Sequence, residues 1–205
     1  MGGMSGSYSS LARFDNSSSY IFAWVSRGAV ELSENDWMGD GYTHSLNRTN
    51  GRRVAIATLS DKETLVSAQA SSTLGAEGDS QITWVTPEIG PDRSNAHVAV
   101  FDDHYALVSW EEIEAPECDF VAMGCGGAFT GTYYQLVDKD GKSVGEAIKS
   151  MDTYVAGDMV TLGDGRICWP YVEMEWSLSK GSGFGSVEDQ TKANSISFAC
   201  VSLDM

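Results

Sequence analysis

Short hydrophobic runs separated by turn-forming residues make up most of this chain. Four of them combine aromatic with aliphatic or β-branched side chains: YIFAWV, YALVSW, SQITWV and RICWPYV. Such runs, bounded by Gly, Asp, Asn or Ser, are typical of β-strands. Long helical periodicity is absent, and residues 144–151, which are compatible with a helical turn, fit strand and loop better. The pattern predicts an all-β protein.

Turn signals stand between these runs. Asn50-Gly51, Asp140-Gly141 and Asp164-Gly165 each combine Asn or Asp with a following Gly. Such a dipeptide accepts the positive φ angles of a type I′ turn, the favoured two-residue connection of a β-hairpin. The dipeptides therefore predict hairpins.

An internal repeat links two halves of the sequence. GYTHSLNRTNGRRV, from Gly41, aligns without a gap with GTYYQLVDKDGKSV, from Gly131. The segments before and after these also match in the same order, and they place Trp24 on Trp110 and Trp84 on Trp169. Large rings that recur at matching strand ends are expected to pack between neighbouring sheets.

This repeat has a recognisable form. AHVAVFDDHYALVSWEE followed by GTYYQLVDKDGKSVGEAI resembles the blade repeats of secreted bacterial and fungal β-propellers. The resemblance implies a β-propeller-like array of four-stranded antiparallel blades, each of about 40–50 residues. The array is either a complete small propeller or part of a larger one completed by another chain, and the alternative fold is a β-sandwich. The resemblance concerns architecture and names no activity, because propellers host many functions.

The repeat also predicts the domain organisation. Residues 10–205 are expected to form a single propeller-like domain with repeat units at 10–86 and 97–176. Residues 1–9 lack the charged and apolar regions of a signal peptide. They are expected to be a disordered or cloning-derived start, or the start left after removal of a leader.

Charge excludes some partners. The net charge of −16 would repel phosphate backbones and anionic membranes, so nucleic acid is not an expected ligand. No run of about 18 apolar residues is present, so no membrane insertion is expected.

The cysteines and two glycosylation sequons indicate a secreted protein. Cys118 and Cys125 flank a short loop and are expected to form a local disulfide. Cys168 and Cys200 lie in strand-like runs and are expected to pair across a sheet. The sequons, at Asn16 and Asn47, point to the same extracellular compartment and to a glycoprotein.

Carboxylates supply the candidate catalytic residues. Glu173 and Glu175 alternate in YVEMEW, which places both on one face of a strand, and Glu112 follows Trp110 closely. Paired carboxylates on one face can act as acid and base in glycoside hydrolysis. The alternative is that these glutamates have no catalytic role and form the solvent-exposed face of an antiparallel strand.

Other polar and aromatic residues are candidates for binding. The candidate ligand-binding aromatics, which could stack on sugars, are Trp37, Trp176 and Tyr133. The candidate cation ligands are Asp102, Asp103, Asp138 and Asp140. Their oxygens would suit Ca²⁺, but the later positions of an EF-hand loop are not met, so polar turns are the better interpretation and no cofactor is expected.

These observations lead to three hypotheses. The first is a secreted, non-catalytic protein that binds a glycan or a protein partner through propeller-rim loops such as 27–40 and 113–130. The second is a carboxylate-dependent glycoside-active enzyme. The third is a structural subunit of a larger assembly, formed through exposed strand edges.

Overall fold

β-Strands are the regular elements of the part of the chain that is described. The computed structural model describes residues 9–34, 43–47, 49–64, 66, 82–120, 124–153, 155, 157–171 and 195–203, and gives only the backbone of 29–34, 43–47, 118–120 and 124. The strands are β1 (Ser9–Arg13), β2 (Tyr20–Ser26), β3 (Ala29–Glu34), β4 (Thr43–Asn47), β5 (Arg53–Leu59), β6 (Thr83–Trp84), β7 (Asp92–Val100), β8 (Tyr105–Phe120), β9 (Gly124–Asp138), β10 (Ser143–Ser150), β11 (Val160–Thr161), β12 (Ile167–Tyr171) and β13 (Ser197–Val201). The prediction of an all-β protein is confirmed for these residues, including strand at 143–150.

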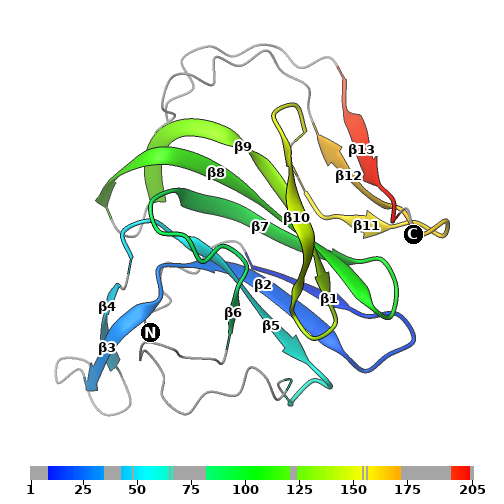
Figure 1. The fold of residues 1–205 in the computed structure, drawn as a ribbon, viewed down its shortest axis with the longest axis horizontal. Helices are drawn as coiled ribbons and strands as arrows, with labels where there is room; N and C mark the ends of the chain where they lie inside the picture. Colours follow the sequence, from blue (N-terminus) through cyan, green and yellow to red (C-terminus); the bar gives the residue numbers. More distant parts are fainter. Residues whose placement is uncertain are drawn as a thin grey trace.

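The strands form three antiparallel sheets in chain order, with one inserted hairpin (Figure 1). The first sheet has the order β1-β2-β5-β6, the second β7-β8-β9-β10 and the third β11-β12-β13. β3 and β4 pair with each other and are inserted between the second and third strands of the first sheet. Each sheet is therefore a meander in which consecutive strands are neighbours, apart from this insertion.

The central part of the second sheet, in β7, β8 and β9, is buried on both faces because it lies between the other two sheets, whereas β10 is largely exposed. Val98, Val108 and other residues on one face pack on the first sheet, and Ala99, Leu107 and others on the opposite face pack on the third. Successive residues of a strand point to opposite faces, so a strand buried on both sides is hydrophobic at nearly every position. The run from Ala106 to Val108 has this character and is at most 3% exposed.

The first strands of the three sheets are neighbours. The Ser10 hydroxyl donates to the Val98 carbonyl at 3.4 Å, and further along both chains the Asp15 N–H donates to the Asp102 carbonyl at 3.3 Å. The two contacts advance in the same direction, so β1 and β7 run parallel. On the other side of β7, the Thr161 hydroxyl of β11 donates to the Val100 carbonyl.

Two of the three predicted Gly turns are hairpins, but of another type. Across Asp140-Gly141 the Asp138 N–H donates to the Lys142 carbonyl at 2.9 Å, and only Gly141, at φ 81°, has a positive φ angle there. The turn from Leu162 to Arg166 is closed in the same way at 2.7 Å, with Gly165 at φ 82°. These are three-residue loops with a left-handed glycine, not two-residue type I′ turns.

The Asn50-Gly51 prediction was wrong for a different reason. Neither residue has a positive φ angle. A Cβ on Gly51 would lie 2.5 Å from the Pro91 carbonyl oxygen. Glycine is required there because the chain before β7 passes directly over it.

The gapless repeat alignment does not join equivalent strands. Residues 41–54 include β4, which pairs only with β3, whereas residues 131–144 include β9, which pairs with both β8 and β10. Trp84 lies on β6, the fourth strand of the first sheet, while Trp169 lies on β12, the second strand of the third sheet. The match of those two segments reflects a shared turn and strand composition and not a shared position.

Two tryptophans pack between sheets as predicted. Trp110 is 4% exposed and belongs to the cluster between the first and second sheets. Trp169 is 2% exposed and stacks on Tyr134 across the contact between the second and third sheets, with ring centroids 5.0 Å apart. Trp24 is half-buried, and Trp84 lies under the Arg53 guanidinium at 3.9 Å.

One predicted disulfide is confirmed. Cys168 and Cys200 lie opposite each other on β12 and β13 and are bonded. Cys125 is also disulfide-bonded, while the side chain of its predicted partner, Cys118, lies outside the described residues. The described part of the chain has no helix that is long and apolar enough to cross a membrane.

Candidate functional site: the long-connection end

Long connections leave the three sheets at the same end, which we call the long-connection end. In each sheet they join the second strand to the third: 27–52 carries the β3–β4 hairpin, 113–130 is the extension of β8 and β9, and 172–196 joins β12 to β13. β1 runs parallel to β7, and so does the chain leading into β11, because Val155 lies beside Asn95 and Thr161 beside Val100. Equivalent connections of the three sheets therefore lie at the same end. Figure 1 shows β3–β4 and the far ends of β8 and β9 on the same side of the molecule.

The opposite end carries mainly tight turns. Four connections there are each closed by a backbone hydrogen bond of 2.7–3.0 Å: Phe14–Ser19, Phe101–Tyr105, Asp138–Lys142 and Leu162–Arg166. The fifth, residues 60–82, is longer and lies mostly outside the described residues. Most of the chain length available for variable surface loops therefore belongs to the long-connection end.

A group of buried charges, which we call the arginine–carboxylate cluster, lies at the base of the long connections. Its centre is the pair Arg52–Asp92, whose members are 7% and 2% exposed. The Asp92 carboxylate accepts hydrogen bonds from the backbone N–H of Arg52 at 2.7 Å and from its Nε at 2.9 Å. This pair joins the start of β5 to the start of β7, and hence the first sheet to the second.

Arg93 extends the cluster across the second sheet. Its Nε donates to Glu112 Oε2 at 2.8 Å, and its Nη1 donates to the Glu88 carbonyl at 2.9 Å. The other carboxylate oxygen of Glu112 accepts from the Thr130 hydroxyl at 3.3 Å. Glu112, a candidate catalytic residue, thus has both oxygens engaged by neighbouring strands, which favours a structural role for it.

Arg27 ties the first long connection to the second. It is 2% exposed, its Nε donates to the Asn50 carbonyl at 2.6 Å, and its Nη2 donates to Cys125 Sγ at 3.4 Å. Burial lowers the pKa of Arg27, and the nearby Asp92 carboxylate partly restores it. The disulfide-bonded end of the β9 hairpin is therefore held against the end of β2.

A second polar group, centred on Glu111, lies at the contact between the second and third sheets. The strand pairing of β7 shifts between Ser94 and His97, and Asn95 there has a φ angle of 53°. Such a bulge redirects side chains. The Asn95 amide donates to Glu111 Oε1 and to the Val155 carbonyl, both at 2.8 Å, and its oxygen lies 2.9 Å from His97 Nε2.

Burial dominates the acid–base properties of this group. It raises the pKa of the Glu111 carboxyl, against the opposing effect of the Asn95 hydrogen bond. It lowers the pKa of His97, against the attraction of Asp158. It raises the pKa of Tyr134 to about 12, while the side-chain hydrogen bond with Thr153, whose hydroxyl lies 3.2 Å from the Tyr134 hydroxyl, acts in the opposite direction.

The candidate ligand-binding aromatics are separated by the structure. The ring of Tyr133 stacks on Trp110 at 5.6 Å between centroids, and the Lys149 ammonium lies 5.6 Å from its centre. Both contacts occupy the ring that a sugar would need. Trp37 and Trp176 lie outside the described residues, as do the candidate catalytic residues Glu173 and Glu175.

The candidate cation ligands act in turns at the end opposite the long connections. Asp102 Oδ1 accepts the N–H groups of His104 and Tyr105 at 2.7 and 2.8 Å. Asp138 Oδ1 accepts those of Asp140 and Lys142 at 3.0 and 2.8 Å. Asp103 is paired with His104 at 3.5 Å. Within the described residues, no three His, Cys, Asp or Glu side chains gather closely enough to hold a metal ion.

The two sequons differ in what the structure shows. Asn16 is exposed in the tight turn between β1 and β2, with a φ angle of 48°. Its side chain is open to modification there. Asn47 lies at the end of β4, where only the backbone is described.

Sequence reasoning missed the arginine–carboxylate cluster and the Glu111 group. Arg52 and Asp92 are 40 positions apart, and Arg27 and Cys125 are 98 apart. No local spacing connects such residues. The only sequence signal was the unusual placement of adjacent arginines, Arg52-Arg53, at the start of a hydrophobic strand. Comparisons with protein-family models, with curated proteins and with solved structures found no match for this chain.

Proposed function

We propose that this protein is a secreted, non-catalytic recognition protein of β-propeller architecture that binds a glycan or a protein partner at the long-connection end. The observation that carries the proposal is the concentration of the long second-to-third-strand connections at one end of the stacked sheets. Scaffolds commonly place binding residues on such loops, because the rigid strands position them while the loops can vary.

Three features support the propeller arrangement. Each sheet is an antiparallel meander, the sheets follow one another in chain order, and the first strands β1, β7 and β11 are neighbours. In a propeller the first strand of every blade lines the central channel, so neighbouring first strands are expected. The burial of both faces of the central part of the second sheet also fits blades that pack face to face, whereas a sandwich has two sheets with one buried face each.

Recognition is favoured over catalysis by the state of the carboxylates. Glu112 is bound by Arg93 and Thr130, and Glu111 is bound by Asn95 inside a sheet contact. The disulfide between Cys168 and Cys200 and the exposed Asn16 sequon are compatible with the proposed secretion.

The experiment compares matched charge changes at the two ends. Glu114 and Glu117 are exposed on the β8–β9 extension, and Asp103 and Asp140 are exposed in tight turns. Wild type, the Glu114→Lys/Glu117→Lys variant and the Asp103→Lys/Asp140→Lys control are tested on a glycan array and against candidate secreted proteins. The first variant is expected to weaken binding by about tenfold or more, equal to about 1.4 kcal/mol. The control is expected to bind as the wild type does.

Two results would contradict the proposal. One is a wild-type protein that binds nothing on the array and none of the candidate proteins. The other is equal loss of binding in both variants, which would place recognition away from the long-connection end.

A further inference from the structure

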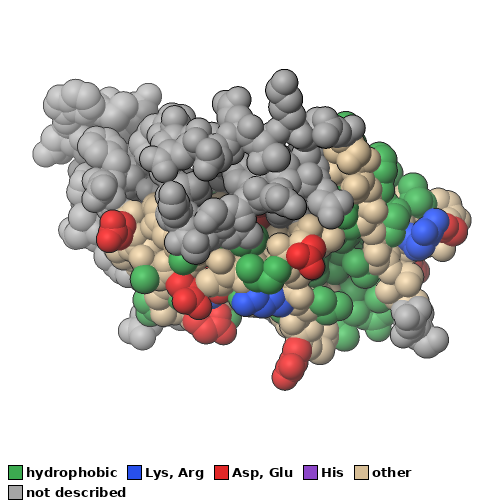
Figure 2. All heavy atoms as spheres, turned by 90° about the horizontal axis from the view of Figure 1, so that it is seen from above, with side chains coloured by type: hydrophobic (Ala, Val, Ile, Leu, Met, Phe, Trp, Pro, Cys, Tyr) green, Lys and Arg blue, Asp and Glu red, His purple; other side chains and the backbone are tan. Residues whose placement is uncertain are grey.

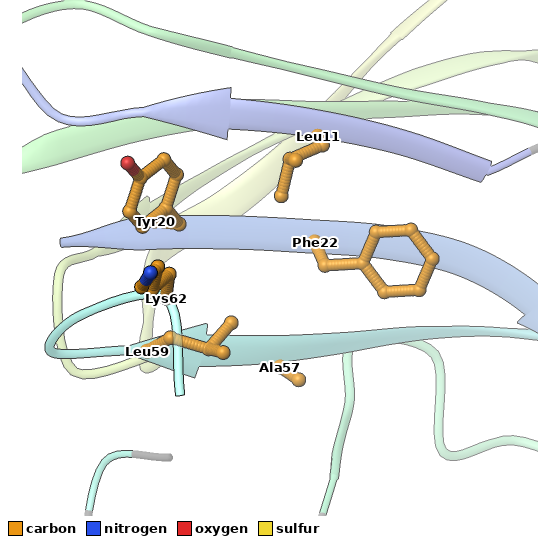
Figure 3. A pocket seen from close by; sticks show the side chains of 6 residues that line it. All are labelled: Leu11, Tyr20, Phe22, Ala57, Leu59 and Lys62. Carbon is orange, nitrogen blue, oxygen red and sulfur yellow. The ribbon is translucent and has the colours of Figure 1, made fainter. Parts of the chain in front are cut away.

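The stack of sheets ends in two apolar faces, one on each side. In the first sheet, side chains that alternate with the buried ones point away from the second sheet, and they line a hollow of about 520 Å³ (Figure 3). The hollow is lined by Leu11, Tyr20, Phe22, Ala57, Leu59 and Lys62. Leu11 is 63% exposed. We call this surface the first-sheet free face.

The other free face belongs to the third sheet. Phe198 and Val160 are 71% and 55% exposed, and they lie on the face opposite Ala199 and Ile167, which pack on the second sheet. Figure 2 shows hydrophobic side chains gathered on the side where the third sheet lies, at the right in both views. We call this surface the third-sheet free face. Exposed apolar groups on a strand face indicate a surface that another sheet covers.

The tryptophans show what kind of surface the first-sheet free face is. Trp24, Trp110 and Trp169 lie on the second strands of the three sheets. Trp110 and Trp169 point toward the preceding sheet, and Trp24 points to the corresponding side of the first sheet, away from the second sheet. Trp110 and Trp169 are thereby buried against the preceding sheet, at 4% and 2% exposure. Trp24 occupies the same position in the first sheet, stacked on Phe22 at 5.1 Å. The face is therefore built like the two that are covered.

We propose that a second copy of this chain packs its third-sheet free face onto the first-sheet free face, so that two copies form a closed ring. Within one chain, the face of the first sheet opposite Trp24 packs on the Trp110 face of the second sheet, and the other face of the second sheet packs on the Trp169 face of the third. The proposed contact continues that series, with Phe198 of one copy at the hollow beside Leu11 of the other. The inference rests on the propeller arrangement in the proposed function.

The number of sheets in the described residues suits a ring of two copies. The contact joins two different surfaces, and such contacts form rings when the rotation closes and filaments when it does not. In the described residues each copy has three stacked sheets, so two copies contribute six of them, within the range of about four to eight blades that propellers use. Closure would cover both free faces of both copies. It would also place the two long-connection ends on the same side of the ring.

The first test is the native mass at about 100 µM, where a dissociation constant of about 1 µM gives mostly dimer. The wild type is expected at twice the 22.1 kDa of the chain, with no larger species at higher concentration. The junction is apolar, and each copy has a net charge of −16, so the two copies repel each other. The dimer is therefore expected to become more stable when salt screens this repulsion. A monomer, or oligomers that keep growing with concentration, would overturn the proposal.

Paired variants test which faces meet. Leu11→Lys and Phe198→Asp each alter one free face at an exposed position, so the fold of the monomer is expected to survive. Each variant alone is expected to be monomeric. A mixture of the two is expected to regain the dimer, because one junction is then unaltered and the other brings Lys beside Asp. A dimer that persists in Phe198→Asp alone would show that like faces pair, and this would overturn the head-to-tail contact.

Matched controls change exposed apolar residues elsewhere. Ile148→Lys and Ile89→Asp alter side chains that are 61% and 74% exposed and lie outside both free faces, and both variants are expected to remain dimeric. The binding experiment separates the two proposals, since the monomeric Phe198→Asp variant is tested on the same glycan array. Binding by a wild type that is monomeric would leave recognition standing and remove only the ring.

Discussion

The contact between the first and second sheets and the contact between the second and third sheets both join neighbouring sheets, but they are built from different side chains. Between the first and second sheets the core is mostly aliphatic, with Ile21, Val54 and Val98 among its members, and its edge is closed by the arginine–carboxylate cluster. Between the second and third sheets the core combines aliphatic side chains with a stacked aromatic pair, Tyr134 and Trp169, and its polar group is centred on Glu111. The first contact is bordered by paired opposite charges, and the second by a buried carboxyl whose partner is the neutral Asn95 amide.

The difference predicts how each contact responds to change. Removing one member of a buried pair of opposite charges destabilises the protein, because the other charge is left buried. A single buried carboxyl with neutral partners responds to pH instead, because burial favours its neutral form. The first contact should therefore be sensitive to substitution and the second to acidity as well as to loss of ring packing.

The largest effect is expected from Trp169→Ala. The ring is 2% exposed and fills the contact between the second and third sheets, so its removal should cost about 4 kcal/mol of the free energy of unfolding. Chemical denaturation measures the loss. The control is Trp24→Ala, at the equivalent position of the first sheet, where the ring is half-buried. Measured in the monomeric Phe198→Asp background, in which no second copy covers this ring, it should lower the free energy of unfolding clearly less. Equal losses there would remove the distinction between a covered and a free face.

A loss of about 3 kcal/mol is expected from Asp92→Asn, because Arg52 would keep its buried charge without its carboxylate. The comparison is the double variant Arg52→Met/Asp92→Leu, which removes both charges and should be less destabilised than the single variant. If the double variant loses as much or more, apolar packing and hydrogen-bond geometry would matter more at this contact than the unpaired charge.

The smallest effect is expected from Glu111→Gln, and its sign depends on pH. The pKa of Glu111 is raised in the folded protein, so the folded state keeps the proton at a pH where the unfolded chain has lost it. Stability from this group is therefore present below the ordinary glutamate pKa and is lost as pH rises from there through the raised pKa of the folded state. Glutamine can keep the Asn95 hydrogen bond without the charge. The variant should be more stable than the wild type at neutral pH.

Thermal unfolding across pH measures this difference. The advantage of Glu111→Gln should shrink as pH falls toward the ordinary glutamate pKa. His97 acts in the opposite direction, because its pKa is lowered and its contribution is lost as pH falls below the ordinary histidine value. The measurement is therefore made in a His97→Gln background. An advantage that does not change with pH would contradict the assignment to the Glu111 carboxyl.

Several features could be predicted locally. The strands around 105–110 and 166–171 follow from the spacing of their apolar residues, and two Asp-Gly turns were placed correctly. The Cys168–Cys200 disulfide was predicted because both residues lie in strand-like runs. The turn type was wrong because the dipeptide alone does not say how many residues the loop uses. Asp138 and Leu162 bond across three-residue loops instead.

The candidate site could be predicted much less well. The sequence indicated the loop 113–130, but the residues at its base were missed, and Glu112 was considered without its partner Arg93. The tertiary contacts also decide which tryptophans are equivalent, since Trp84 shares a motif with Trp169 but lies on a different strand of its sheet.

The sequence by itself determined the all-β class, most strand positions and one disulfide, because these depend on alternation and turn propensity over a few residues. Only the tertiary structure decided the order of the sheets, the pairing of Arg52 with Asp92 and the exposure of the outer faces. The physical reason is that burial and charge pairing are properties of contacts between distant segments. A strand pattern shows that a face is apolar, and packing decides what covers it.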